Sequence, residues 1–173
     1  MKKITITLLL FVTCFTMFAQ ENPGNNEVKI NMSNLIGFKW LDLGYEHILN
    51  EESTIGANIL FSLDNGSEGL DEYRTFSLTP YYRHFFSNKY AEGFFVEAFT
   101  MIHSGEEEIY TGIGGTYVDE KYTDLAVGVS VGAKWVSDRG FVAEIYAGIG
   151  RDMLDQSDLE VVGRGGLSIG YRF

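Results

Sequence analysis

The residues most capable of chemistry are charged side chains that alternating strands would turn to one face. On the inner face of a narrow barrel, such groups pair across strands and fill the lumen, or they line a selective polar path. A barrel of ~8 strands is just wide enough for side chains, so the pattern favours a filled lumen. Arg83 and Glu97 fall on neighbouring expected strands and are predicted to pair. Glu144 and Arg164 are a second predicted pair. The predicted lumen network consists of Asp42, Glu46, Arg83, Glu97, Lys134, Glu144, Arg164 and Arg172.

Histidine beside serine suggests nucleophilic catalysis, and His103 precedes Ser104 directly. Adjacent residues of a strand point to opposite faces, so these two side chains cannot readily form a base and nucleophile pair. His47 and His84 lie apart from other candidate groups. We therefore predict no catalytic residues and no enzyme, and an enzyme that modifies lipid is the third-ranked alternative.

Acidic runs such as Glu106-Glu107-Glu108 offer hard oxygen ligands for divalent cations. Asp152, Asp155 and Asp158 do not match the EF-hand pattern, which needs carboxylates on alternate residues and a fixed glycine. The glycine-rich segment 112–115 lacks the strand, helix and lysine of a phosphate-binding loop. We predict no metal and no cofactor, and we interpret the acidic runs as solvated loops.

The strand that best defines the architecture runs from Thr123 to Trp135. One parity of this stretch is apolar, and the other contains Asp124, Ser130 and Lys134 among glycines. An apolar face toward lipid and a polar face toward a closed lumen explain both parities. The lumen glycines are expected to make room for aromatic side chains. These are Tyr81, Phe95, Phe99 and Tyr146.

The same alternation recurs along the chain and predicts an antiparallel barrel of ~8 strands. Pro80 removes one ladder hydrogen bond, so the parity beyond it is open to a shift. The expected strands cover 28–33, 41–50, 54–62, 75–86, 94–103, 123–135, 141–150 and 164–173, with a first turn at 34–37 and a long loop at 104–121.

Long acidic loops alternate with short turns, which is typical of outer-membrane barrels. Aromatic residues gather at both expected interfaces of the strands. At the loop end they are Phe38, Trp40, Phe61, Tyr73, Phe76 and Tyr122, and at the turn end Phe86, Phe94, Trp135, Phe141, Tyr171 and Phe173.

The N-terminus has the order of a secretory signal peptide: Lys2 and Lys3, an apolar run, and Ala19 before the expected cut. A lipoprotein anchor at Cys14 is the alternative, although the preceding residues fit a lipobox poorly. The predicted organisation is a signal peptide at 1–19, a short polar lead at 20–27 and a barrel domain at 28–173. Losing the two lysines changes the formal charge from -11 to -13 and leaves no cysteine.

The acidic balance argues against nucleic acid as a partner, because that requires clustered lysine and arginine. A mean hydropathy of -0.03 is no objection to a membrane protein, since alternation hides a lipid-facing band from averaged hydropathy.

The chain ends on Phe173, with apolar residues at alternate positions before it: Leu167, Ile169 and Tyr171. This pattern resembles the C-terminal assembly signal of Gram-negative outer-membrane barrels, and the chain resembles the small OmpA/OmpX-like class. It is most similar to a family of such barrels catalogued as a domain of unknown function. The motifs are Asn34-Leu35-Ile36-Gly37, Leu43-Gly44-Tyr45-Glu46, Leu78-Thr79-Pro80-Tyr81-Tyr82-Arg83 and Gly93-Phe94-Phe95-Val96-Glu97. The resemblance implies the fold and no established activity.

The sequence thus predicts an all-β, ~8-stranded antiparallel transmembrane up-and-down barrel in the outer membrane of a Gram-negative bacterium. We expect a monomer with a plugged polar lumen and a structural or surface-interaction role through its acidic loops. The expected partners are outer-membrane lipid, lipopolysaccharide and the assembly machinery.

The first alternative is a channel for small solutes or hydrophobic ligands, based on Phe95, Phe99 and Val142 on the lumen face. The architectural rival is a soluble secreted lipocalin-like barrel, which requires the apolar parity to face inward. Extraction without detergent separates a soluble barrel from an embedded one.

Overall fold

A computed structural model describes residues 24–63, 74–111, 116–154 and 160–173. The expected signal peptide at 1–19 and residues 20–23 of the polar lead lie outside these ranges, as do Tyr73, Asp155 and Asp158. Within the described ranges, no helix is both long and apolar enough to cross a membrane.

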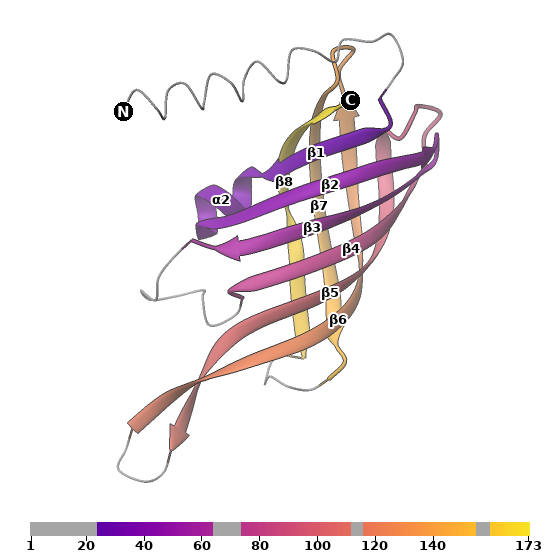
Figure 1. The fold of residues 1–173 in the computed structure, drawn as a ribbon. Coiled ribbons are helices and arrows are strands. Elements are labelled where there is room, and N and C mark those ends of the chain that lie inside the picture. Colours follow the sequence, from indigo (N-terminus) through magenta and orange to yellow (C-terminus); the bar gives the residue numbers. More distant parts are fainter. Residues whose placement is uncertain (1–23, 64–73, 112–115, 155–159) are drawn as a thin grey trace, which may run out of the picture.

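Eight antiparallel strands close into a barrel, each pairing with its neighbours in the chain and β1 pairing with β8 (Figure 1). The predicted all-β, eight-stranded antiparallel architecture is therefore confirmed. The strands are β1 (Asn26–Asn31), β2 (Trp40–Asn50), β3 (Ser53–Ser62), β4 (Phe76–Phe85), β5 (Gly93–Thr111), β6 (Thr116–Val136), β7 (Phe141–Asp152) and β8 (Val161–Arg172). We call the end with the β2–β3, β4–β5 and β6–β7 connections the turn end, and the opposite end the loop end.

The first connection contains a helix where a strand end and a turn were expected. β1 begins at Asn26, before the expected start, and ends at Asn31, where α2 (Met32–Phe38) follows. The Asn31 side chain accepts a hydrogen bond from the backbone N–H of Asn34 at 3.1 Å, as a helix N-cap does. Lys39 ends the helix in the left-handed conformation. The prediction of strand through Ser33 was wrong because this cap outweighs the alternation.

The segment expected as a long loop at 104–121 is largely a two-stranded ribbon. β5 and β6 pair continuously up to Thr111 and Thr116. The β4–β5 ladder ends at Ser104 and the β6–β7 ladder at Ala126, so the ribbon extends past the rest of the barrel (Figure 1). The loop prediction was wrong because the charged residues of this segment suggested a solvated loop, whereas the segment pairs as two strands.

Apolar side chains point outward and polar side chains inward. On β6, Val127, Val129 and Val131 are 48–57 % exposed. The alternate residues of β6 point into the lumen, where Ser130 is 2 % exposed and Lys134 is 0 % exposed. A soluble lipocalin-like barrel needs the opposite arrangement, with apolar side chains enclosed. The alternation in the sequence therefore describes a barrel that is inside out relative to a soluble one.

The inward and outward sides of β4 are the same before and after Pro80. Leu78 pairs with Ile102 and Tyr81 with Phe99, which is the same register on both sides of the proline. Pro80 itself points outward, opposite Ala57. The strand therefore keeps its parity, and Arg83 remains on the inner face at 1 % exposure.

Glycines on the inner face make room for aromatic rings, as predicted. A Cβ atom at Gly128 would lie 2.4 Å from the Phe99 ring, and one at Gly132 would lie 2.6 Å from the Phe95 ring. These separations are far inside van der Waals contact, so residues larger than glycine would displace the rings. The aromatic side chains can therefore occupy a narrow lumen.

Candidate functional site: the charged lumen

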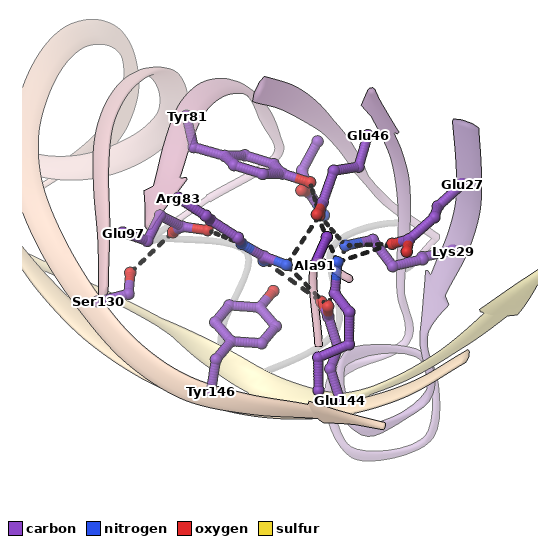
Figure 2. Close-up of polar contacts among 12 residues, drawn as sticks. Glu27, Lys29, Glu46, Tyr81, Arg83, Ala91, Glu97, Ser130, Glu144 and Tyr146 are labelled. Atoms are coloured by element: carbon purple, nitrogen blue, oxygen red, sulfur yellow. Dashed lines mark hydrogen bonds and ion pairs between the residues drawn. The ribbon is translucent and has the colours of Figure 1, made fainter. Parts of the chain in front are cut away.

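Arg83 lies at the centre of the lumen and contacts three carboxylates (Figure 2). Its Nε donates to Glu97 at 2.6 Å, directly across the β4–β5 ladder. Its Nη1 donates to Glu46 at 2.9 Å and to Glu144 at 2.8 Å, from β2 and β7. The predicted Arg83–Glu97 contact is present, and the same guanidinium also bridges strands that are not neighbours.

Lys29 and Lys134 complete the cationic side of this cluster. Lys29 Nζ donates to Glu46 at 2.5 Å and to Glu144 at 3.0 Å. Lys134 Nζ donates to Glu27 at 2.8 Å and also to Glu46. Glu46 therefore receives two ammonium groups in addition to Arg83, and it is fully buried. Such dense pairing is required, because an unpaired buried charge is strongly destabilising.

Toward the turn end, Arg172 links the charged network to the connection between β4 and β5. Its Nη2 donates to Glu27 at 2.6 Å and to the Ala91 carbonyl at 2.8 Å. Ala91 packs in an apolar cluster with Ile48 and Phe85, all 2 % exposed or less. The β4–β5 connection thus folds across the turn end, beneath the charged layer.

Toward the loop end, Arg164 extends the network. Its Nη1 donates to Glu97, and its Nη2 donates to Asn58 at 3.0 Å. Asn58 in turn donates to Asp42 at 2.9 Å. The predicted Glu144–Arg164 pair is absent, because Glu144 lies opposite Ser168 and Arg164 opposite Gly148 in the β7–β8 register. That prediction was wrong.

All eight predicted lumen residues point inward, and Asp42 is connected to the other seven only through Asn58. Those seven join through ion pairs around Glu46 and Glu97 or through Glu27. Sequence reasoning missed Glu27 and Lys29, which are 0 % and 6 % exposed. Both share the parity of Asn31: Lys29 was already on the polar side of the first expected strand, and extending that strand back into the lead would have found Glu27. The directly joined predicted residues, with Arg172 attached by way of Glu27, are Glu46, Arg83, Glu97, Lys134, Glu144, Arg164 and Arg172.

Aromatic rings pack against the cations inside the lumen. The Arg83 guanidinium lies 4.5 Å from the Tyr81 ring centroid and 4.3 Å from that of Phe95. The Tyr81 hydroxyl donates to Glu46 at 2.9 Å. In a desolvated setting, cation–π contacts of this kind contribute about 2 kcal/mol each. Charged and aromatic groups together fill the middle of the barrel.

His103 pairs with a carboxylate inside the lumen. Its Nε2 lies 2.8 Å from Asp152 Oδ1, and both side chains are buried. The Ser104 hydroxyl lies 3.5 Å from the hydroxyl of Thr75. Asp152, expected in a solvated loop, is thus a lumen residue of β7. Among the described residues, no group of three or more His, Cys, Asp or Glu side chains is placed to hold a metal ion.

Tyr122, expected in the aromatic rim, points inward and is 7 % exposed. Its ring meets His103 edge to face at 5.9 Å. The expectation was wrong because Tyr122 has the same parity as Asp124 and Ser130 on β6.

The C-terminal residues lie on the outer face of β8. Leu167, Ile169 and Phe173 are 54 %, 51 % and 38 % exposed, and Tyr171 is half-buried against Phe141. The Phe173 backbone pairs with Asn26 of β1, with N···O distances of 2.8 and 3.1 Å. This last residue therefore takes part in closing the barrel.

Outward apolar side chains and a lumen filled with paired charges define a small inside-out β-barrel. The chain belongs to the family described as "Protein of unknown function (DUF3575)", whose model matches residues 5–169. The resemblance to an uncharacterised barrel family is thereby confirmed.

The fold is similar to that in the crystal structure of the N-terminal beta-barrel domain of Pseudomonas aeruginosa OprF. The two chains are 11 % identical, with a TM-score of 0.55. The match covers 88 % of this chain and 100 % of the OprF domain. At that identity the likeness shows a shared fold. No curated protein matches the sequence.

Proposed function

We propose that this protein is a closed outer-membrane β-barrel that anchors surface segments of a Gram-negative cell and does not conduct solutes. The lumen supports this proposal: the inward charges of β1, β2, β4, β5, β6 and β7 pair with one another across its whole width. At the level of this network, a barrel of ~8 strands leaves no room for an open path beside such side chains.

The outer surface of the barrel supports the proposal that the protein is embedded in a lipid bilayer. The outward valines of β6 would otherwise expose a continuous apolar band to water. Aromatic pairs lie at both rims, as in membrane barrels. They are Phe61 with Phe76 at the loop end, and Phe86 with Phe94 and Phe141 with Tyr171 at the turn end.

The β5–β6 ribbon supports a role in surface interaction. It extends beyond the barrel at the loop end, and its strands include Glu106-Glu107-Glu108 and Asp119-Glu120. In this proposal the protein is a monomer without enzymatic activity. It is inserted by the outer-membrane assembly machinery, and the ribbon meets lipopolysaccharide or a protein partner at the surface. Bridging cations would connect the acidic ribbon to anionic lipopolysaccharide.

Planar-bilayer recording tests the closed lumen. We expect the folded protein to give little or no conductance, because paired charges and the apolar cluster at the turn end obstruct the path. A large porin inserted under the same conditions is the positive control. Large, steady single-channel steps from this protein would contradict the proposal and favour the small-solute channel.

A further inference from the structure

A second feature of the lumen lies between the charged network and the loop end. A cavity of ≈ 430 Å³ is lined there by residues of α2, β2, β3, β4, β5 and β8. Its walls combine the apolar side chains of Phe38, Trp40, Leu60 and Met101 with the guanidinium of Arg74. Polar side chains, among them Asn34, Ser77 and Thr79, complete the wall, and a volume of this size is typical of small-molecule sites.

Arg74 is the unusual member of this wall. It is 9 % exposed, and no carboxylate of the described residues lies within ion-pair distance. One Nη donates to the Gly163 carbonyl at 3.1 Å, while its Nε has no acceptor. Burial lowers the pKa of Arg74, with the charge of Asp42 acting in the opposite direction. A buried guanidinium without an anionic partner is costly unless something else compensates it.

Neighbouring groups do not provide that compensation. The Asp42 carboxylate accepts from three amides, those of Asn31, Asn34 and Asn58, at 2.8–3.2 Å. Arg164, the other cation of the wall, is already paired with Glu97 and Asn58. The cavity therefore holds one cation that lacks a direct counter-charge.

Trp40 supplies a second unused donor and a flat surface. Its indole Nε1–H is buried without an acceptor, and its ring lies 5.8 Å from the Arg74 guanidinium carbon. A carboxylate beside a planar apolar group would satisfy the guanidinium while stacking on or beside the indole. A second negative charge would have no partner and would be repelled by Asp42.

We propose that this cavity binds a small organic monoanion, a carboxylate attached to a flat apolar body, with Arg74 as the anion contact and Trp40 as the apolar wall. This binding site adjoins the charged network at Arg164 and goes beyond the anchoring role. The cavity belongs to the loop end, so the ligand would come from outside the cell if the barrel has the proposed orientation.

Tryptophan emission tests the site, because the chain has two tryptophans and Trp135 lies on the outer surface. In a Trp135→Phe background, the full chain folded in detergent micelles reports on Trp40 alone. We expect benzoate to change the emission saturably and benzamide to bind at least about tenfold more weakly, since it lacks the charge. Inorganic phosphate should give no response.

Arg74→Gln in the same background should weaken benzoate binding at least about tenfold and leave the benzamide response unchanged. Arg139→Gln, an exposed cation of the β6–β7 turn, is the matched control and should bind normally. Ser77→Leu places bulk in the cavity wall and should abolish both responses, which keeps the test decisive if the Arg74 variant does not fold. A non-saturable benzoate response, equal binding of benzamide or phosphate, or full benzoate affinity in either cavity variant would overturn the proposal.

Discussion

Arg83→Met is expected to lower the free energy of unfolding by about 3–5 kcal/mol, the range for breaking a buried ion pair. The substitution keeps much of the side-chain volume but removes the positive charge that contacts Glu46, Glu97 and Glu144. Each of these carboxylates retains another cation or a hydroxyl donor, and the excess of negative charge remains buried. The loss should therefore be large while the barrel fold is still recognisable.

Urea titration of the protein refolded in lipid vesicles measures this effect. Lys89→Met is the matched control, because Lys89 pairs with Glu92 at the surface and its side chain is 68 % exposed. Surface pairs contribute at most about 1 kcal/mol, so the control should unfold almost as the native chain does. Equal stability of the two variants would mean that the lumen network is hydrated or rearranged.

Val129→Arg is expected to destabilise the protein in lipid vesicles by about 2–4 kcal/mol, the cost of arginine at the middle of a membrane barrel. Val129 lies on the outer face of β6, between Ser130 and Gly128 of the inner face, and it is 57 % exposed. At an exposed position in water, the same change would alter stability by about 0.5 kcal/mol or less. The size of the effect therefore distinguishes lipid from water around β6.

The same vesicle titration applies, with Asp138→Arg as the control. Asp138 is an exposed residue of the β6–β7 turn, so an added arginine there should stay hydrated. If Val129→Arg were as harmless as Asp138→Arg, the outward valines would not be facing hydrocarbon.

Strand faces could be predicted from the sequence because side-chain direction in a strand has a strict period of two. The alternation on β6 places Val129 outside and Lys134 inside without any knowledge of the neighbouring strands. Pro80 did not interrupt this rule, since its pairing with β5 resumes in the same register. Fold class and the inward direction of the charges follow from this single regularity.

Contacts across the lumen could not be predicted in the same way. Lys29 and Glu144 meet although they are 115 residues apart, and their strands are not neighbours. Such contacts depend on how far each ladder is staggered around the barrel, which the alternation of one strand does not contain. The same stagger places Glu144 opposite Ser168, which is why the expected pair with Arg164 was wrong.

Residues outside the regular strands were also beyond the reach of sequence patterns. Arg74 precedes β4, so no parity assigned it to the lumen, yet it is buried in the wall of the loop-end cavity. The helix α2 depends on a side-chain cap at Asn31, a local interaction that competes with the strand alternation. Both features affect the loop end, where the ligand site is proposed.

Cell fractionation followed by gel electrophoresis, with and without heating, tests the central claim of a compact barrel embedded in the outer membrane. We predict that the protein is recovered in the outer-membrane fraction and that its apparent size changes on heating, because the closed barrel resists detergent until heated. Recovery in the soluble fraction without detergent, with no change on heating, would contradict the claim. The outward apolar face would then have to be covered by something other than lipid.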